Sequence, residues 1–392
     1  MYDRIPKIAI LIEPNTSSNR NFLLGVSKFA RLHGPWVFYF TPPSYLKSGK
    51  QEQILNKIKD ELSGMIVCDT TKISERFSSR IPIIVVRTVT EPSASFPNVI
   101  DIIPNDKAIG RLAAKHLMEC GFNYYAYCGF RNMFWSERRQ SAFSKTLTSA
   151  GHKVYTFKPK NKINSWSKEF QVLCDWLDSL SKPIGIFCCN DERSRSIMEA
   201  CKTRGLSVPE NVAILGVDNN QLICEMAQTP LSSINLNTEK AGYEAAERLK
   251  ELMAGENTHH RQHTITIEPT NVVTRQSTNI LAINDAETAN AVRFIRENSN
   301  KPINVDDVID AVYVSRRVLE YRFKKHLGRS IYREIKRYRT ELIAKLLLET
   351  DISITRIALS LGFPDVNHIS RYFRSQKGIT PKEFRNKYKG QG

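Results

Sequence analysis

The sequence contains no apolar run near the roughly 18 residues that a membrane-spanning helix needs, so a membrane-spanning protein is not expected. It has no Gly-rich phosphate loop, no Gly-x-Ser-x-Gly turn and no His-Glu-x-x-His pair, and therefore offers no support for an enzyme. Its eight cysteines include no Cys-x-x-Cys pair, which favours reduced thiols in a cytoplasmic protein. No signal peptide is expected either, because Met1 leads almost directly into an apolar strand.

Acidic residues are comparatively scarce: 40 Asp and Glu stand against 57 Lys and Arg, which gives a net charge of +17. The surplus is uneven, since residues 285–392 hold 22 basic and 13 acidic residues (+9), leaving 35 and 27 (+8) for the preceding 284 residues. The tail is thus about three times as positive per residue, as expected of a segment that binds phosphates. Charge alone would fit a solvated basic face equally well.

Short apolar runs alternate with helical patterns through the first 278 residues, which predicts parallel α/β layers. There are too many strands for one small sheet, so two doubly wound lobes on either side of a cleft are expected. The predicted strands are Lys7–Glu13, Val37–Phe40, Gly64–Cys68, Ile81–Val86, Tyr124–Tyr127, Lys153–Phe157, Ile184–Cys188 and Val212–Val217. The predicted helices include 106–120, 136–149, 168–180 and 191–204.

Ligands of such folds bind near the carboxyl ends of the strands, so the loops after the strands hold the candidate ligand-binding residues. They are Arg20, Arg87, Trp135, Arg139, Asn190, Asp191 and Asp218. Their charged and amide groups could hydrogen-bond several hydroxyls, and the Trp135 ring could pack on a sugar. Alternatively, Asp191 could cap a helix and Asp218 could close a turn. The histidines between Thr258 and His263 lack acidic or thiol partners, so neither a metal nor a cofactor is expected.

Ordered motifs across residues 5–278 resemble the ligand-binding domain of the LacI/GalR family. They are Cys189-Asn190-Asp191, the segment from Gly205 to Val212, Leu215 to Asn219, Pro230 to Ile234, and the closing Val273 to Thr278. The resemblance implies a type I periplasmic-binding-protein fold with sugar contacts at Arg139, Asn190 and Asp218. Leu236 stands where many sugar receptors of this fold have Gln, which removes one expected hydrogen bond.

A helical motif occurs twice between about residues 303 and 388. Leu319 and Phe323 form an apolar i,i+4 pair followed by Gly328, and Ile369 and Phe373 form another followed by Gly378. Each pair defines a helix with one buried edge, and two such helix-turn-helix units indicate DNA binding. A long helix over 331–348 should join them through Ile331, Ile335, Leu342 and Leu346. The outward-facing candidates for DNA contact are Arg316, Arg317, Glu320, Tyr321, Lys324, Asn367, His368, Ser370, Arg371 and Arg374.

The same segment resembles the AraC/XylS-type DNA-binding domain, through Thr350 to Ile354, Ile357-Ala358, Leu361-Gly362-Phe363 and Gly378 to Pro381. The resemblance implies two recognition helices in successive major-groove segments on one face of the duplex. It assigns base contacts to Arg317, Glu320, Tyr321, Asn367 and Arg371. Tyr321 replaces the usual Arg, so that half-site is expected to specify a different base.

Together the resemblances predict a ligand-binding domain (1–278), a linker (279–288) and a DNA-binding domain (289–392). The expected protein is a cytoplasmic, homodimeric transcription activator that contacts RNA polymerase and binds direct-repeat half-sites in DNA. Its expected ligand is a pentose, and D-xylose is the first candidate. Arg20 occupies an arginine position that is shared with pentose-binding regulators of this kind. The alternatives are another sugar or small molecule, a sugar receptor without a role in DNA binding, and a sugar-modifying enzyme.

Overall fold

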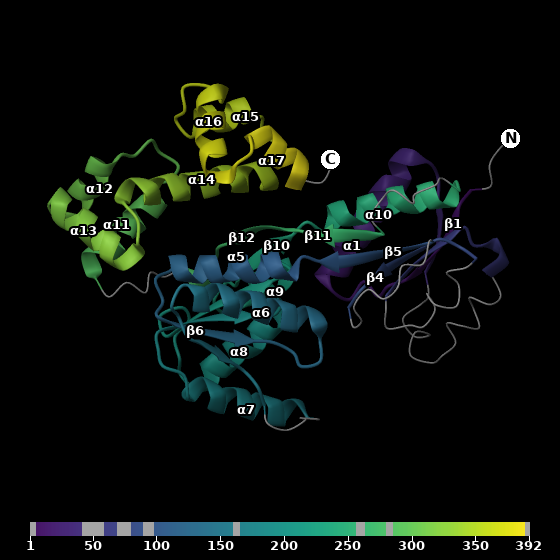
Figure 1. Ribbon diagram of the computed structural model, residues 1–392, viewed down its shortest axis with the longest axis horizontal. Coiled ribbons are helices and arrows are strands. Elements are labelled where there is room, and N and C mark those ends of the chain that lie inside the picture. Colours follow the sequence, from purple (N-terminus) through teal and green to yellow (C-terminus); the bar gives the residue numbers. More distant parts are fainter. Residues whose placement is uncertain are drawn as a thin grey trace.

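The computed structural model describes residues 5–40, 59–68, 80–88, 98–159, 165–255, 263–279 and 285–388. Two six-stranded sheets form the two lobes of an α/β domain, and a separate group of helices follows them in the chain (Figure 1). The helical domain lies along one side of the α/β domain, next to α5 (Asp106–Glu119) and α10 (Thr238–Met253) (Figure 1). The two-lobed α/β architecture predicted from the sequence is therefore confirmed.

The first lobe is built on a sheet with the order β11-β5-β4-β3-β1-β2, in which all neighbouring strands are parallel. Its helices α1 (Ser17–His33) and α10 touch backbone to backbone. A Cβ on Gly25 would lie 1.9 Å from the Glu239 carbonyl oxygen, and one on Gly242 would lie 2.0 Å from that of Phe22. The strands are β1 (Lys7–Leu11), β2 (Val37–Phe40), β3 (Gly64–Cys68), β4 (Ile83–Val86), β5 (Val99–Pro104) and β11 (Thr264–Ile267), with η1 at Lys59–Glu61.

The second lobe is built on a sheet with the order β12-β10-β9-β8-β6-β7, parallel except for the antiparallel pair β10 and β12. Its strands are β6 (Tyr124–Cys128), β7 (Val154–Thr156), β8 (Ile184–Cys188), β9 (Val212–Val217), β10 (Ser232–Leu236) and β12 (Pro269–Val273). The helices are α5, α6 (Phe134–Ser149), α7 (Trp166–Asp178), α8 (Asp191–Thr203) and α9 (Gln221–Met226), with η2 at Gln276–Thr278.

The chain crosses between the lobes at β5 to α5, at β10 to α10 and at β11 to β12. Hydrogen bonds join these crossings. The Asn105 side-chain amide donates to both carboxylate oxygens of Glu268 at 3.0 Å, and the Asn237 backbone N–H donates to the Glu268 carbonyl at 2.9 Å. We call these three crossings the hinge, because a change in the angle between the lobes has to occur there.

The helical domain contains two helix-turn-helix units joined by one long helix. The first unit pairs α12 (Val305–Val312) with α13 (Arg316–Leu327), and the second pairs α15 (Ile354–Ser360) with α16 (Val366–Lys377). The joining helix is α14 (Ile331–Glu349), while α11 (Ala286–Glu297) begins the domain and α17 (Pro381–Tyr388) ends it. Residues 280–284 of the expected linker lie outside the described residues.

The long helix α14 contributes to both small cores. Ile331 and Ile335 are buried with Leu319 and Phe323 in the first unit, as expected. In the second unit, Ile343 and Leu347 are fully buried, whereas the expected Leu342 and Leu346 are only half-buried at its edge. The fully buried positions of the second core are therefore each one residue beyond the predicted ones, which is about 100° around α14, and the predicted leucines lie at the edge of that core. Within the described ranges, no helix is both long and apolar enough to cross a membrane.

Candidate functional site

Polar side chains from four parts of the chain gather at the carboxyl ends of the strands in the second lobe. Asn190 and Asp191 follow β8 after one intervening residue, Asp218 directly follows β9, and Arg139 projects from α6, the helix after β6. Asp106, the first residue of α5, pairs with Arg139. We call these five residues the polar centre, and four of them are among the ligand-binding residues predicted from the sequence.

Arg139 is the buried cation of the polar centre, with 4% of its surface exposed. Its Nε donates to Asp106 Oδ1 at 2.9 Å and its Nη1 donates to the Cys189 carbonyl at 2.6 Å. The Trp135 ring packs against the guanidinium, 4.9 Å from its carbon atom, and so fixes its position from one side. Burial raises the pKa of Asp106 to about 6 although Arg139 acts to lower it. Among the described residues, Asp106 Oδ2 has no hydrogen-bond partner.

Asp191 is not the helix cap that one interpretation of the sequence allowed. Asn190 caps α8 by accepting from the Arg193 backbone N–H at 2.9 Å, and Asp191 is the first helical residue. The Asp191 carboxylate accepts hydrogen bonds from the Ser233 hydroxyl at 2.6 Å and from the Asn220 backbone N–H at 2.7 Å. Burial and the neighbouring charge of Asp218 nevertheless raise its pKa to about 8.

Asp218 lies in the left-handed region of the backbone map, with φ of 96°, directly after a strand buried along its length. Non-glycine residues rarely adopt this conformation, and where they do it is commonly part of a binding site. Burial raises the pKa of the Asp218 carboxyl while the charge of Arg139 opposes that rise. The polar centre therefore offers several carboxylate oxygens as acceptors around one guanidinium donor, a combination suited to a ligand with several hydroxyl groups.

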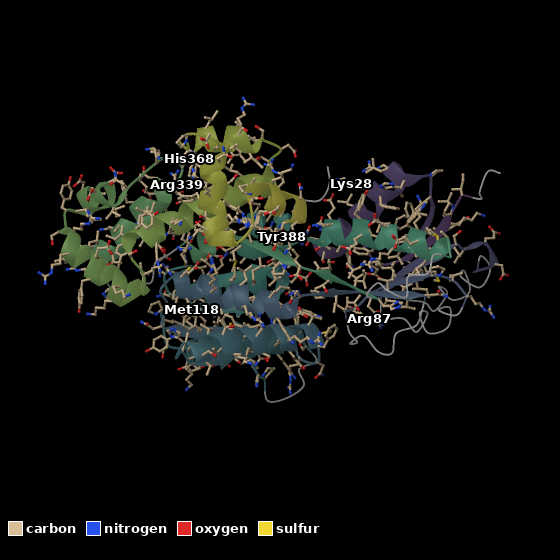
Figure 2. All side chains as sticks on the ribbon, turned by 45° about the horizontal axis from the view of Figure 1, so that its top comes forward. Lys28, Arg87, Met118, Arg339, His368 and Tyr388 are labelled. Carbon is tan, nitrogen blue, oxygen red and sulfur yellow. The ribbon has the colours of Figure 1, made fainter. Side chains whose placement is uncertain are left out.

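The first lobe holds the two remaining predicted arginines, and both have partners inside that lobe. Arg20 is exposed, and its Nη1 donates to the carbonyls of Pro14 at 3.0 Å and Asn15 at 3.2 Å. Arg87 forms an ion pair with Asp101 at 2.7 Å, with both side chains 11% exposed. In Figure 2, Arg87 lies on the first lobe, apart from Met118 on α5 of the second. A ligand role for Arg20 and Arg87 stays a prediction.

Sequence reasoning missed two residues of this region, Asp106 and Ser233. Asp106 follows β5, a strand that the apolar pattern did not reveal, so the position after its carboxyl end was not considered. Ser233 lies within β10, from which it donates to Asp191 past the intervening strand β9. Most of the histidine segment from Thr258 to His263 lies outside the described residues, and no metal-binding cluster occurs among those described.

The recognition helices α13 and α16 bury one edge each and present the other to solvent. Leu319, Phe323, Ile369 and Phe373 are completely buried. On the opposite edges, Glu320 and Ser370 are half-buried, and the Ser370 hydroxyl donates to the Val366 carbonyl at 2.6 Å. The remaining predicted DNA contacts are exposed: Arg316, Arg317, Tyr321, Lys324, Asn367, His368, Arg371 and Arg374.

The two recognition helices begin differently. Ser315 occupies the N-cap position of α13, but its side chain makes no capping hydrogen bond. Asp365 caps α16 with one carboxylate oxygen, which accepts from the backbone N–H groups of Asn367 at 2.7 Å and His368 at 2.8 Å. The same oxygen lies 2.9 Å from His368 Nδ1. These bonds lower the pKa of Asp365 and hold the His368 ring at the start of the helix (Figure 2).

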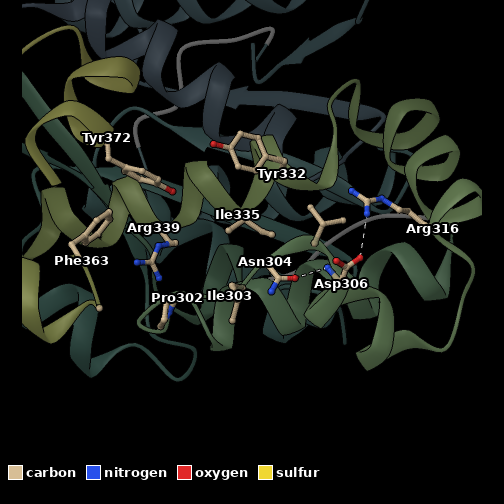
Figure 3. Close-up of a pocket in the computed structure, with 12 residues that line it drawn as sticks. Pro302, Ile303, Asn304, Asp306, Arg316, Tyr332, Ile335, Arg339, Phe363 and Tyr372 are labelled. Atoms are coloured by element: carbon tan, nitrogen blue, oxygen red, sulfur yellow. Dashed lines mark hydrogen bonds and ion pairs between the residues drawn. The ribbon is translucent and has the colours of Figure 1, made fainter. Parts of the chain in front are cut away.

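A hollow of about 420 Å³ separates the two units, with Arg316 at one end and Tyr372 at the other (Figure 3). Tyr332, Ile335 and Arg339 of α14 line it. The buried Arg339 guanidinium donates to the Leu361 carbonyl at 2.7 Å, in the second unit, and also to the Lys301 carbonyl, which precedes the first. Arg339 therefore ties the two units to the joining helix and fixes their separation.

Comparison with known proteins finds a match within each domain. The family model of a periplasmic binding protein-like domain matches residues 114–278, and that of a helix-turn-helix domain matches residues 308–387. The xylose operon regulatory protein of Haemophilus influenzae is 28% identical over 98% of this chain and 99% of its own length. That of Escherichia coli K12 is 27% identical, with 98% of each chain covered.

A solved structure described as that of the xylose-binding transcription activator xylR covers 99% of this chain and 100% of its own, with 26% identity and a TM-score of 0.60. The structure of a Lactococcus lactis transcription regulator, CcpA, covers 70% of this chain with 18% identity and a TM-score of 0.57, which supports the fold of the α/β domain alone. The chain thus joins a periplasmic-binding-protein-like domain to a helix-turn-helix domain, and over nearly its whole length it is similar to the xylose operon regulatory proteins.

Proposed function

We propose that this protein is a sugar-responsive, sequence-specific DNA-binding transcription regulator, with D-xylose as the first candidate ligand and activation of xylose catabolism genes as its role. The observation that carries the proposal is the pairing of two sites on one chain: a largely buried polar centre suited to hydroxyl groups, and two exposed cationic recognition helices on one rigid spacer. Its full-length similarity to xylose operon regulatory proteins supports the same assignment.

On the DNA side, the exposed edges of α13 and α16 carry the side chains that recognise base edges. Arginine contacts guanine through two hydrogen bonds and asparagine contacts adenine in the same way, so Arg371 and Asn367 are the strongest candidates. Tyr321 takes the place of Arg371 on α13, and the two units therefore specify different bases. A continuous α14 suits two successive major-groove segments, and a homodimer would bind direct-repeat half-sites in the cytoplasm and contact RNA polymerase.

On the ligand side, carboxylates of the polar centre would accept hydroxyl protons while Arg139 donates to a ring or hydroxyl oxygen. Trp135 would cover one face of the sugar, as it already covers the Arg139 guanidinium. Leu236 ends β10 with 8% of its surface exposed and offers no amide. A second candidate function, the same architecture with a different sugar as ligand, follows from this missing hydrogen bond.

Isothermal titration of D-xylose, L-arabinose, D-ribose and D-glucose into the full chain separates these candidates. We expect D-xylose to bind and Asp218→Ala to abolish its heat signal. If only another pentose bound, the protein would still be proposed as a sugar-responsive regulator, with that pentose as its ligand in place of D-xylose. A response to none of the four, with the folded protein verified by circular dichroism, would contradict the sugar assignment.

Selection from a randomised duplex pool, followed by fluorescence anisotropy, tests the DNA assignment. We expect a repeated motif and an affinity that falls about ten-thousandfold between 50 and 200 mM salt. The logarithm of the binding constant falls against the logarithm of the salt concentration with a slope of about 0.9 per phosphate contact, and the four recognition helices of a homodimer would bring roughly two contacts each. Absence of an enriched motif, or affinity insensitive to salt, would favour a sugar receptor without a role at DNA.

A further inference from the structure

The helical domain is bound to the second lobe through a buried charge network on α14. Arg337 Nη1 donates to Glu119 Oε2 at 2.9 Å, across the domain boundary, and Arg337 Nη2 donates to Glu334 at 2.7 Å. Glu334 is completely buried and is also paired with Arg329. The side chains of Arg337 and Glu119 are 16% and 12% exposed, so this contact is shielded from water and salt.

The same helical domain is bound to the first lobe through its last helix. The Lys240 ammonium group on α10 donates to the Lys387 carbonyl at 2.7 Å, and the Asn237 side-chain amide donates to that carbonyl at 3.3 Å. Carbonyls at the end of a helix lack partners within the helix and carry the negative end of its dipole, so a lysine is a favourable cap there. Asn237 belongs to the hinge, which brings this contact directly to the point where the lobes rotate.

One rigid body thus touches two bodies that can move relative to each other. Glu119 ends α5 in the second lobe, and Lys240 lies near the start of α10 in the first. Figure 1 shows α14 alongside α5 and α17 beside the start of α10. A rotation of the lobes cannot preserve both contacts unless the helical domain itself bends, because its two units share α14 and the Arg339 bonds.

We propose that Glu119 and Lys240 form a two-point docking surface for the helical domain of the same chain, through which the angle between the lobes sets the orientation of the recognition helices. This inference rests on the proposed function and adds the route by which ligand and DNA sites communicate. Two sites are coupled only when both bias the same two-state element, and the docked domain is such an element.

The Arg337–Glu119 contact and the Lys240 contact differ in strength, and this difference determines which of them breaks when the lobes rotate. Breaking the Arg337–Glu119 pair would leave a buried charge unpaired, a costly change. The bonds of Lys240 to the last carbonyls of α17 are exposed and can be replaced by water. We therefore expect the helical domain to stay with the second lobe, while the α10–α17 contact forms or breaks as the lobes rotate.

The test uses the full chain, with D-xylose as the ligand probe and the selected DNA motif labelled for anisotropy. The measured quantity is the ratio of DNA affinities with and without sugar. We expect Lys240→Ala to change this ratio about two- to tenfold, the range for losing one typical hydrogen bond at an exposed site. Lys250→Ala is the matched control, since Lys250 lies on the same helix but donates to the His33 carbonyl within the first lobe. We expect it to leave the ratio unchanged.

Glu119→Gln provides a second variant, which keeps an acceptor for Arg337 while removing the charge. We expect it to shift the same ratio in the full chain, with sugar affinity in the absence of DNA retained. A wild-type ratio for both Lys240→Ala and Glu119→Gln would overturn the docking surface, as would an equal shift in Lys250→Ala. Loss of D-xylose or DNA binding by the wild-type chain would instead overturn the proposed function, so the two failures are distinguishable.

Discussion

Arg139 in the α/β domain and Arg371 in the helical domain show how differently one residue type is used in the two halves of this molecule. Arg139 is 4% exposed and holds Asp106, the Cys189 carbonyl and the Trp135 ring. Arg371 is exposed on α16, opposite the buried Ile369 and Phe373. The first arginine has already lost its water and its rotamer freedom, whereas the second still has both.

This difference matches the partners proposed for the two domains. A small, neutral, hydroxyl-rich ligand brings no net charge, so its site has to be desolvated and preorganised by the protein itself. A DNA duplex brings a dense row of phosphates, and solvated cations release counterions when they meet it. Substitution of Arg139 should therefore affect stability and sugar binding, whereas substitution of Arg371 should affect DNA binding.

The largest expected effect is that of Arg139→Ala. It removes one partner of a buried ion pair and leaves the Asp106 carboxyl without its donor, which costs about 3–5 kcal/mol of unfolding free energy. Sugar binding should be lost as well. Arg371→Ala should leave the unfolding free energy unchanged and weaken binding to the selected DNA motif by about 1–3 kcal/mol.

Urea denaturation and DNA anisotropy on both variants check this contrast. Arg139→Lys serves as a control for charge, since lysine keeps the cation but cannot contact Asp106 and the Cys189 carbonyl with one planar group. If Arg371→Ala destabilised the fold as much as Arg139→Ala, the recognition surface would be part of the core and not a DNA contact.

The next effect concerns pH and belongs to the α/β domain alone. Burial and Asp218 raise the pKa of Asp191 to about 8, so the folded state binds more protons than the unfolded state between about pH 4 and pH 8. Stability linked to Asp191 is thus present at low pH and falls as pH rises through this window. Asp191→Asn removes the titration while keeping a polar group next to Ser233 and Asn220.

We expect the unfolding free energy of Asp191→Asn to rise relative to wild type as pH increases from 6 to 8, by up to about 2.7 kcal/mol for one full proton. Urea melts at matched pH values provide the measurement. As a control, Glu192→Gln changes the exposed neighbouring carboxyl and should show no such trend. A difference that stays constant with pH would mean that Asp191 is ionised throughout.

Most of the fold could be predicted from local pattern. Continuous apolar runs marked β3, β8 and β9 at their observed bounds, because strands covered on both faces are apolar at nearly every position. The pattern missed β5, β10, β11 and β12. In β5 the run is interrupted by the buried Asp101, which is paired with Arg87, and β10 carries buried serines. A buried strand position can hold a polar residue whose partner lies far away in the sequence, and such a residue interrupts the apolar pattern by which the strand would be recognised.

The two candidate sites likewise differ in whether local spacing or tertiary contacts define them. The exposed edges of α13 and α16 follow from i,i+4 spacing alone, so their candidate DNA contacts could be named by position. The polar centre depends on tertiary contacts: Asp106 reaches Arg139 across 33 positions, and Ser233 reaches Asp191 across 42. The contact between Arg337 and Glu119 spans 218 positions, and no local motif indicates it.

The smallest expected effect distinguishes the two recognition helices from each other. Asp365→Ala removes a cap that accepts two backbone N–H groups and holds the His368 ring, so it should lower the melting temperature. Ser315→Ala removes a side chain that makes no capping bond and should cost little. Thermal melts of both variants measure this difference, and DNA anisotropy should show a weaker affinity for Asp365→Ala only. Equal melting temperatures would mean that Ser315 acquires its cap in solution, and that the two helices begin with equivalent caps after all.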